Sequence, residues 1–137
     1  MKPLEEINEY LTQAKVFFLS TLQGDQPKCR PIAFHLLQQD RLYFGIGDFK
    51  EVYRQMQQHP KVELCATTGQ GFLRYYGTAV FEQDDAIANQ VLAALPQMQK
   101  LYNDQTGYHL AIFHLEQATA EFHNQLQTEK SYSFPDR

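Results

Sequence analysis

The chain has 137 residues, 43% of them hydrophobic, which is enough for one compact domain with its own core over residues 1–137. The 12 Lys and Arg residues against 16 Asp and Glu residues give a formal net charge of -4, which disfavours nucleic-acid binding. No apolar run approaches the roughly 20 residues of a membrane-spanning helix, and the N-terminus carries acids where a secretion signal carries bases, so we expect a soluble cytoplasmic protein.

The first part of the chain predicts one helix and three strands. Leu4, Ile7 and Leu11 recur at helical spacing among polar residues, as on a surface helix that covers one end of a core. Runs of β-forming residues between Gly, Pro and Asp turns predict strands over residues 16–22, 28–37 and 41–46. Because Pro31 lacks an N–H, the second strand either lies at a sheet edge or leaves backbone groups unpaired there.

The hydrophobic period changes after Gly47. Asp48 and Glu51 have the spacing of a capping box, which predicts a helix that starts at Phe49 and ends at Pro60. Residues 61–68 and 72–81 then read as strands around a Gly-Gln-Gly turn, which predicts a second hairpin.

The last third of the chain predicts further helices and strands. A striped helix runs from Asp84 to Pro96, and a short helical segment follows at residues 98–102. Two strands are expected over residues 108–115 and 118–123, and residues 127–137 have the character of a loosely held tail. Six or seven strands joined mainly by short turns predict a mainly β fold, an antiparallel barrel closed on itself and carrying peripheral helices.

Common catalytic and metal-binding signatures are absent from the sequence. The third glycine of a dinucleotide fingerprint would fall at Lys50, no G-K-[ST] phosphate loop occurs, and the five histidines lack metal-ligand spacing. No serine lies in a nucleophile elbow, and no base is evident beside a cysteine. Cys29 and Cys65 lie far apart in apolar surroundings, which predicts two reduced thiols in the core and neither a disulfide nor a zinc site.

Three basic residues are candidates for binding an anion. Lys50 falls in the first turn of the helix that Asp48 is expected to cap, where unpaired amides and the helix dipole favour a phosphate group. Arg30 precedes the interruption at Pro31, and Arg74 lies on the second hairpin, so both guanidinium groups could join the same ligand if the barrel brings these strands together.

Six motifs in one order carry a family resemblance. They are Phe18-Leu19-Ser20-Thr21, Pro27-x-x-Arg30-Pro31-Ile32, Leu42-Tyr43-Phe44-Gly45, Lys50-Glu51-Val52-Tyr53-Arg54-Gln55-Met56, Pro60-Lys61-Val62-Glu63-Leu64-Cys65-Ala66 and Leu73-Arg74-x-x-Gly77. Their order and separation over about residues 16–116 resemble the pyridoxamine 5′-phosphate oxidase-like family of FMN-binding split barrels.

This resemblance implies a homodimer with FMN at the subunit interface and a small-molecule substrate. It implies that Lys50 holds the phosphate, that the flavin lies along two backbone segments, and that Arg74 comes from the same or the other subunit. The cofactor-binding residues expected on this basis are Arg30, Pro31, Ile32, Phe44, Gly45, Ile46, Lys50 and Arg74. A strand interrupted at Pro31 leaves backbone groups free for a flavin ring, and Arg30 is the candidate to stabilise the negative charge of reduced flavin. No catalytic side chain is assigned.

The expected function is that of an FMN-dependent oxidoreductase, which passes electrons from a nicotinamide-type reductant to a small acceptor. The alternatives are a non-enzymatic module that binds or senses flavin, a haem binder that uses His114 or His123, and a deazaflavin in place of FMN. Two features depart from the family pattern. Ile46 and Gly47 stand where relatives commonly place a hydroxyl residue for the phosphate, and the chain lacks tryptophan and an Arg- and Trp-containing C-terminal segment, so we expect a protein other than the vitamin B6 enzyme itself.

Overall fold

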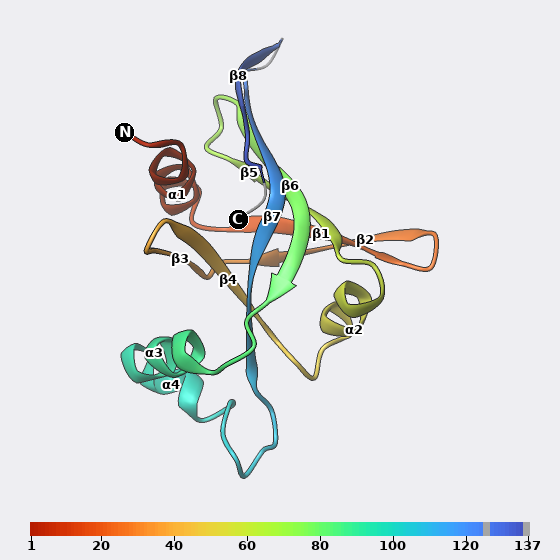
Figure 1. Ribbon diagram of the computed structural model, residues 1–137, viewed down its shortest axis with the longest axis vertical. Coiled ribbons are helices and arrows are strands. Elements are labelled where there is room, and N and C mark those ends of the chain that lie inside the picture. The colour runs from red at the N-terminus through yellow and green to blue at the C-terminus, as the bar shows by residue number, and fades with distance from the viewer. Residues whose placement is uncertain (125–126, 136–137) are drawn as a thin grey trace.

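The computed structural model describes residues 1–124 and 127–135 and shows a mainly β protein with peripheral helices (Figure 1). The strands are β1 Phe17–Gln23, β2 Gln26–Ile32, β3 His35–Gln38, β4 Arg41–Gly47, β5 Lys61–Thr67, β6 Phe72–Phe81, β7 Leu110–His123 and β8 Thr128–Ser133. The helices are α1 Pro3–Ala14, α2 Glu51–Gln58, α3 Ala86–Ala94 and α4 Pro96–Gln99. None of the helices in these described ranges has the length and apolar character needed to span a bilayer.

The strands form one antiparallel sheet that curls into an open barrel. Their order is β2-β1-β5-β6-β7-β4-β3, and β8 adds to β7. The two end strands, β2 and β3, are consecutive in the chain, with only Ala33 and Phe34 between them, yet no pairing joins them within the described residues.

The expected mainly β split-barrel fold is confirmed, with eight strands where six or seven were expected. The prediction of a closed barrel is wrong, because the predicted strand 28–37 breaks where Phe34 packs against a second apolar cluster.

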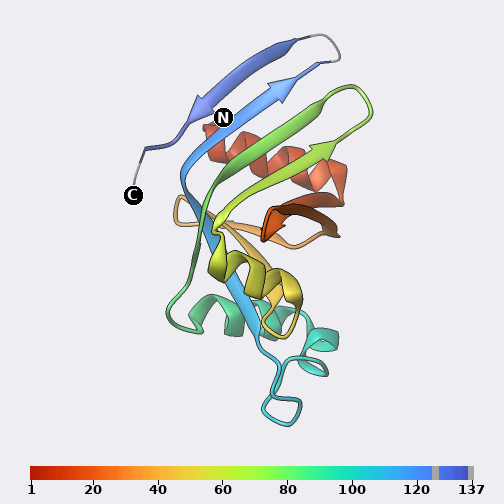
Figure 2. The ribbon, with the colours of Figure 1, turned by 90° about the vertical axis from the view of Figure 1, so that its right-hand side faces the viewer.

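The longest strand, β7, connects three neighbours (Figure 2). It pairs with β6 along most of its length, with β4 at its start and with β8 at its end. Two separate strands were predicted here, which is wrong: the chain passes through Gln117 at a φ of 50° without leaving the sheet. Gly77 of β6 lies opposite this irregularity, and a Cβ there would lie only 2.8 Å from the Glu116 carbonyl oxygen, so the absence of a side chain allows the strands to stay paired.

The segment predicted to be a loose tail instead forms β8 on the edge of β7. The Tyr132 hydroxyl donates to Glu6 Oε1 at 2.9 Å, and the Lys130 ammonium pairs with the same carboxylate, so β8 is also tied to α1. This polar segment has no alternating apolar pattern, and it forms a strand because its backbone pairs with the open edge of β7. Residues 136–137 of the predicted tail lie outside the described residues.

Helix α2 starts later than predicted and is not capped by Asp48. It begins at Glu51 with Lys50 as N-cap residue and no side-chain cap hydrogen bond. The Asp48 carboxylate accepts a hydrogen bond from the His109 backbone N–H at 2.9 Å and lies 3.2 Å from the His109 ring nitrogen. The capping prediction fails because this distant loop, which the local sequence does not reveal, takes the carboxylate.

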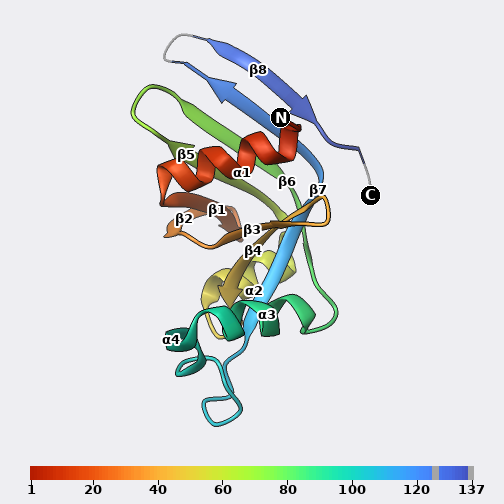
Figure 3. The same ribbon diagram turned by 90° about the vertical axis from the view of Figure 1, so that its left-hand side faces the viewer.

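Two apolar clusters hold the fold together. The main cluster fills the barrel around Phe17, Phe44 and Phe113, with α1 lying across it on one side (Figure 3) and α2 at its end. The second cluster lies between α3, α4 and the outer side of β4 and β7 (Figure 1). Both cysteines are free, as expected, but only Cys65 is half-buried. The core prediction is wrong for Cys29, which is exposed because it points outward from β2.

Candidate functional site

The open side of the barrel leaves two backbone edges without strand partners. Strand β2 pairs with β1 alone, so its other edge at Arg30–Ile32 has no ladder partner among the described residues. Strand β3 pairs with β4 only as far as Phe44, so residues 45–47 of β4 pair with β7 on one side and with no described strand on the other. Only Ala33 and Phe34 separate Ile32 from His35, the partner of Phe44, so Ile32 and His35 are at most about 11 Å apart. The two backbone segments predicted to line a flavin therefore end near each other, and we call the place between their unpartnered edges the opening.

Lys50 stands beside this opening at the start of α2. Its side chain is exposed, its ammonium group lies 5.9 Å from the centre of the Phe49 ring, and no carboxylate of the described residues pairs with it. The Lys50 N–H donates to the Gly47 carbonyl at 3.2 Å and the Tyr53 N–H to the Lys50 carbonyl at 3.1 Å, which leaves the N–H groups of Glu51 and Val52 without an acceptor among the described residues. A cation without an ion-pair partner, next to unpaired backbone amides, is a suitable binding site for a phosphate group.

The Arg30 guanidinium lies between β1, β2 and the buried face of α2. Its Nη1 donates to the Leu19 carbonyl at 3.0 Å and to Thr21 Oγ1 at 2.7 Å, and its Nη2 donates to Gln55 Oε1 at 2.9 Å. All three acceptors are neutral. Burial lowers the pKa of Arg30, but a guanidinium stays charged at any physiological pH. Arg30 is therefore a half-buried cation, fixed in place, without a carboxylate partner among the described residues.

Of the other predicted residues, Phe44 lies between two strand partners, β3 and β7, whereas Pro31, Ile32, Gly45 and Ile46 lie on strand edges without a described partner. Phe44 is fully buried and Ile46 is 6% exposed, so their side chains belong to the core. Gly45 lies between Phe34 and Ile112, either of which would approach an added Cβ within 3.3 Å. Pro31 is exposed on the outer surface, opposite Phe18 in the ladder, and Ile32 packs at the margin of the main cluster.

Packing explains why no hydroxyl residue follows β4. A Cβ at Gly47 would lie 2.7 Å from the Phe49 ring and 2.9 Å from the Tyr102 hydroxyl. Phe49 is held there by stacking on Tyr108, with ring centres 4.1 Å apart. A serine or threonine at Gly47 would have to displace both rings, so a phosphate at this end of β4 would depend on Lys50 and backbone amides.

The structure does not bring Arg74 to the other two basic residues within one chain. Arg74 Nε donates to Glu63 at 2.8 Å on the outer face of the sheet, and its Nη1 lies 3.7 Å from Glu121. The hydrogen bond that Arg74 donates to Glu63 is the main reason why the pKa of Arg74 is raised. Arg30, in contrast, contacts α2 at Gln55, five residues after Lys50. Residues 50 and 55 are about 7.5 Å apart along the helix axis.

Two residues of the candidate site, Thr21 and Gln55, were not predicted from the sequence. Both are buried, at 3% and 5% exposure, and the Thr21 hydroxyl donates to Gln55 Oε1 at 2.5 Å. The signal was present, since Gln55 interrupts the apolar stripe formed by Val52 and Met56. A glutamine on the inward face of a helix requires a polar partner, which here is Arg30.

The two histidines considered as haem ligands have both ring nitrogens engaged. His114 is 4% exposed, with its nitrogens 2.9 Å from the carboxylates of Glu82 and Glu116. His123 lies 2.8 Å from Glu121 through Nε2 and 3.1 Å from Thr128 through Nδ1. An iron atom would have to displace one of these partners. No cluster of potential metal ligands was found in residues 1–124 and 127–135.

An open antiparallel barrel with free backbone edges at the opening and a lysine at the adjacent helix start defines the class of split β-barrel proteins. The sequence profile of the pyridoxamine 5'-phosphate oxidase family matches residues 3–122, and the chain belongs to this family. No curated protein sequence matches the chain.

Solved structures of similar fold confirm the architecture. A NimC/NimA family protein from Clostridium acetobutylicum superposes with a TM-score of 0.83 at 23% identity, covering 98% of this chain and 95% of that protein. A pyridoxamine 5'-phosphate oxidase-related, FMN-binding protein from Nostoc punctiforme has a TM-score of 0.60 at 18% identity, with 98% of each chain covered. A haem-binding protein from Mycobacterium smegmatis has a TM-score of 0.67 at 16% identity, covering 97% of this chain and 59% of that protein.

Proposed function

We propose that this protein binds FMN at the opening between β2 and β4 and functions as an FMN-dependent oxidoreductase. The observation that carries the proposal is the Lys50 ammonium, which has no ion-pair partner among the described residues and lies at the start of α2, next to the unpaired backbone of β4. FMN binding by the similarly folded protein from Nostoc punctiforme, and the membership of the family, support the same assignment.

The groups at the opening fit the chemistry of FMN. Lys50 and the first amides of α2 supply cationic and N–H donors for a phosphate. The free edges at Arg30–Ile32 and at residues 45–46 supply backbone N–H and C=O groups for the polar edge of a flavin ring. FMN bound here would supply the redox chemistry, and the protein would orient it and adjust its potential.

Arg30 is the residue proposed to favour reduction. Its charge is fixed by Leu19, Thr21 and Gln55 and is not neutralised by a carboxylate of the described residues. A preorganised cation of this kind stabilises negative charge that develops nearby when a hydride is accepted. We propose a nicotinamide-type reductant as the hydride donor and a small molecule as the final acceptor.

A homodimer is part of the proposal, because the outer face near the opening is apolar. Phe18 is 45% exposed and lies in register between Pro31 of β2 and Cys65 of β5. We call these three residues the apolar strip. A second copy of the chain docked on the apolar strip would bury Phe18 and could bring its own Arg74 towards the opening.

Reduction of the purified protein tests the oxidoreductase function. After loading with FMN and removal of excess ligand, the yellow protein is mixed anaerobically with NADH or NADPH. Bleaching of the bound flavin is the expected result. A yellow protein that neither nucleotide bleaches is a flavin-binding module without this activity. Uptake of a deazaflavin in preference to FMN would contradict the cofactor assignment, and a haem absorption band after purification would favour the haem alternative.

A further inference from the structure

A second cavity lies far from the opening. It has a volume of about 620 Å³, which is in the range of small-molecule sites. Its walls come from α1, from the turn between β5 and β6, and from the ends of β7 and β8. Figure 2 shows that this turn is at the end of the β5–β6 hairpin remote from α2. We call this cavity, lined by Tyr10, Thr68, Phe72, Phe122, His123 and Glu129 among others, the α1 groove.

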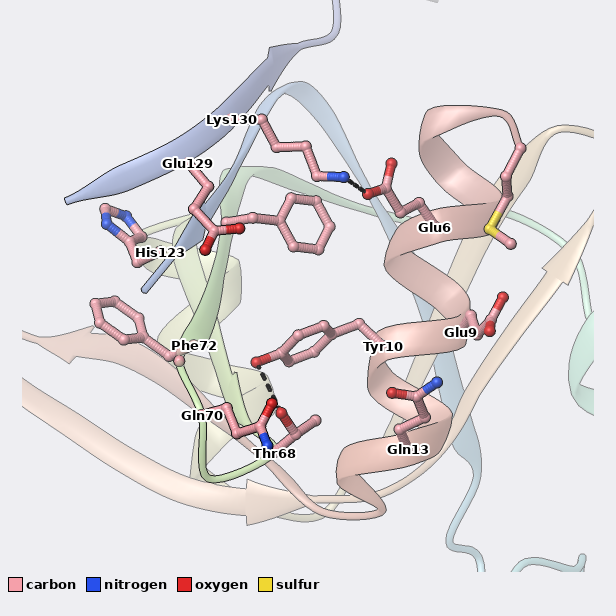
Figure 4. A pocket seen from close by; sticks show the side chains of 13 residues that line it. Glu6, Glu9, Tyr10, Gln13, Thr68, Gln70, Phe72, His123, Glu129 and Lys130 are labelled. Atoms are coloured by element: carbon pink, nitrogen blue, oxygen red, sulfur yellow. Dashed lines mark hydrogen bonds and ion pairs between the residues drawn. The ribbon is translucent and has the colours of Figure 1, made fainter. Parts of the chain in front are cut away.

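Aromatic rings form opposite walls of the α1 groove (Figure 4). Tyr10 extends from α1 and meets the Phe122 ring edge-on, with centres 5.7 Å apart. Phe72 and His123 stand on the other side and are stacked, with centres 4.5 Å apart and planes at 8°. Phe72 and Tyr10 are only half-buried, so flat ring surface faces the cavity.

The turn that forms the floor is held in place by the backbone of β7. A Cβ at Gly71 would lie 2.2 Å from the His123 carbonyl oxygen, so the chain passes directly against β7 there. The Thr67 hydroxyl donates to the Gly71 carbonyl at 2.6 Å and accepts the Gly69 N–H at 3.1 Å. The wall carrying Phe72 therefore exists before any ligand binds, which lowers the entropy cost of binding.

The α1 groove keeps an unneutralised negative charge. The Lys130 ammonium is paired with Glu6, and His123 Nε2 is bonded to Glu121. The Glu129 carboxylate points into the cavity in Figure 4 and makes no ion pair or hydrogen bond with any residue that the structure describes. The Lys130 ammonium lies 5.2 Å from the centre of the Phe122 ring, so the groove already holds one amine against an aromatic face.

From this arrangement we infer that the α1 groove binds a small organic cation with a flat aromatic ring, of the arylalkylamine class. The ring lies between Tyr10 and the Phe72–His123 stack, and the ammonium group reaches Glu129. The lining favours a cation over an anion, because it holds the carboxylates of Glu6, Glu9 and Glu129 against the ammonium groups of Lys130 and the Met1 N-terminus. The inference does not depend on FMN, since the opening and the α1 groove share no residues.

Calorimetric titration with 2-phenylethylamine as the probe tests this inference. We expect saturable binding of the amine and no binding of phenylacetate, which has a similar ring and the opposite charge. Glu129→Gln should weaken amine binding about tenfold, because it removes one charge-assisted contact from an exposed position that the fold does not need. Asp25→Asn, at the exposed β1–β2 turn, removes the same charge elsewhere and should leave the affinity unchanged.

The site itself is located by amide chemical shifts and a second variant. Addition of the amine should shift resonances of Tyr10, Phe72 and His123, with and without FMN present. Phe72→Leu should weaken binding while the protein stays folded, because the residue is only half-buried. The inference is overturned if the amine does not bind saturably, if phenylacetate binds equally well, if Glu129→Gln and Asp25→Asn behave alike, or if the shifts map to the opening.

Discussion

The most informative single residue is Arg30, a cation that is tied to three neutral acceptors at the edge of the opening. If Arg30 served only to hold two strands together, a carboxylate partner would stabilise the fold more than a neutral acceptor does. Arg74 has such a partner in Glu63. At Arg30 the charge is kept and its position is fixed by Thr21 and Gln55. This arrangement suits a group whose role is electrostatic, and it makes Gln55 a positioning residue for that charge.

Substitution of Gln55 separates its structural role from its electrostatic one. Gln55→Leu should lower the free energy of unfolding by about 1–3 kcal/mol, because it leaves buried donors of Arg30 and Thr21 without an acceptor. Gln55→Glu keeps the shape and gives Arg30 a carboxylate, so it should preserve stability but lower the midpoint potential of bound flavin. Urea titration and potentiometry are the measurements. An unchanged potential in Gln55→Glu would mean that the Arg30 charge does not act on the flavin.

At this scale the sequence revealed the basic residues but not their partners. Lys50 and Arg30 could be identified because a lysine near a helix start and an arginine before a proline are local patterns. The engagement of Arg74 by Glu63 and Glu121 could not, since it depends on the register of three strands. The same applies to Asp48, whose partner His109 lies 61 residues away.

Among the elements, β7 depends on one glycine of its neighbour β6. Gly77→Ala should destabilise the protein by about 1–3 kcal/mol, because the new Cβ would meet the Glu116 carbonyl oxygen at 2.8 Å and the Ala118 Cα at 2.9 Å, both backbone atoms. Gly45→Ala is the comparison, since its nearest contacts are ends of side chains at 3.2–3.3 Å. Thermal unfolding should show the larger loss for Gly77→Ala, and equal losses would contradict this account of the bulge.

The attachment of β8 to α1 should depend on pH. The hydrogen bond from Lys130 is the main cause that lowers the pKa of Glu6, and the one from Tyr132 adds to it against the effect of burial. Because the pKa of Glu6 is lower in the folded state, this stabilisation is present above the unfolded-state pKa and is lost as the pH falls through the folded-state value. The pKa of Lys130 is raised, mainly by its hydrogen bond to Glu6, so the pair also weakens when the pH rises through the folded-state pKa of Lys130.

Hydrogen exchange of the β8 amides measures this dependence. The wild type should protect β8 more than Glu6→Gln does at neutral pH, and the difference should shrink as the solution becomes acidic. A difference that stays constant down to low pH would show that the Glu6 charge does not hold β8.

The elements that the sequence predicted well are those with a strong local pattern. The helix at Leu4, Ile7 and Leu11 and the two hairpins appear where they were expected, because amphipathic spacing and Gly-containing turns are local signals. Strand β8 was missed since its polar residues need only an edge to pair with. The break between β2 and β3 was missed because it follows from the packing of Phe34 against residues of β4 and β7.

For the whole molecule, we expect a dimer because Phe18 exposes an apolar strip on the outer face of the sheet. Phe18→Asp should convert the protein to a monomer, because a charge would be buried at the contact, while the exposed position leaves the fold intact. Gln23→Asp, at the exposed end of the same strand, is the control and should not change assembly. Light scattering after gel filtration gives the mass. A wild type with the mass of one chain would contradict the dimer.

Discrimination between FMN and riboflavin tests the central claim most directly, because the two flavins differ only by the phosphate that Lys50 is proposed to hold. Titration by quenching of flavin fluorescence should show that the wild type prefers FMN by about tenfold or more, as expected for a contact of about 1.5–3 kcal/mol. Lys50→Ala should lose most of that preference without losing stability, and Lys61→Ala, beyond the other end of α2, should keep it. If the wild type binds neither flavin, or binds both equally, the opening between β2 and β4 is not an FMN site.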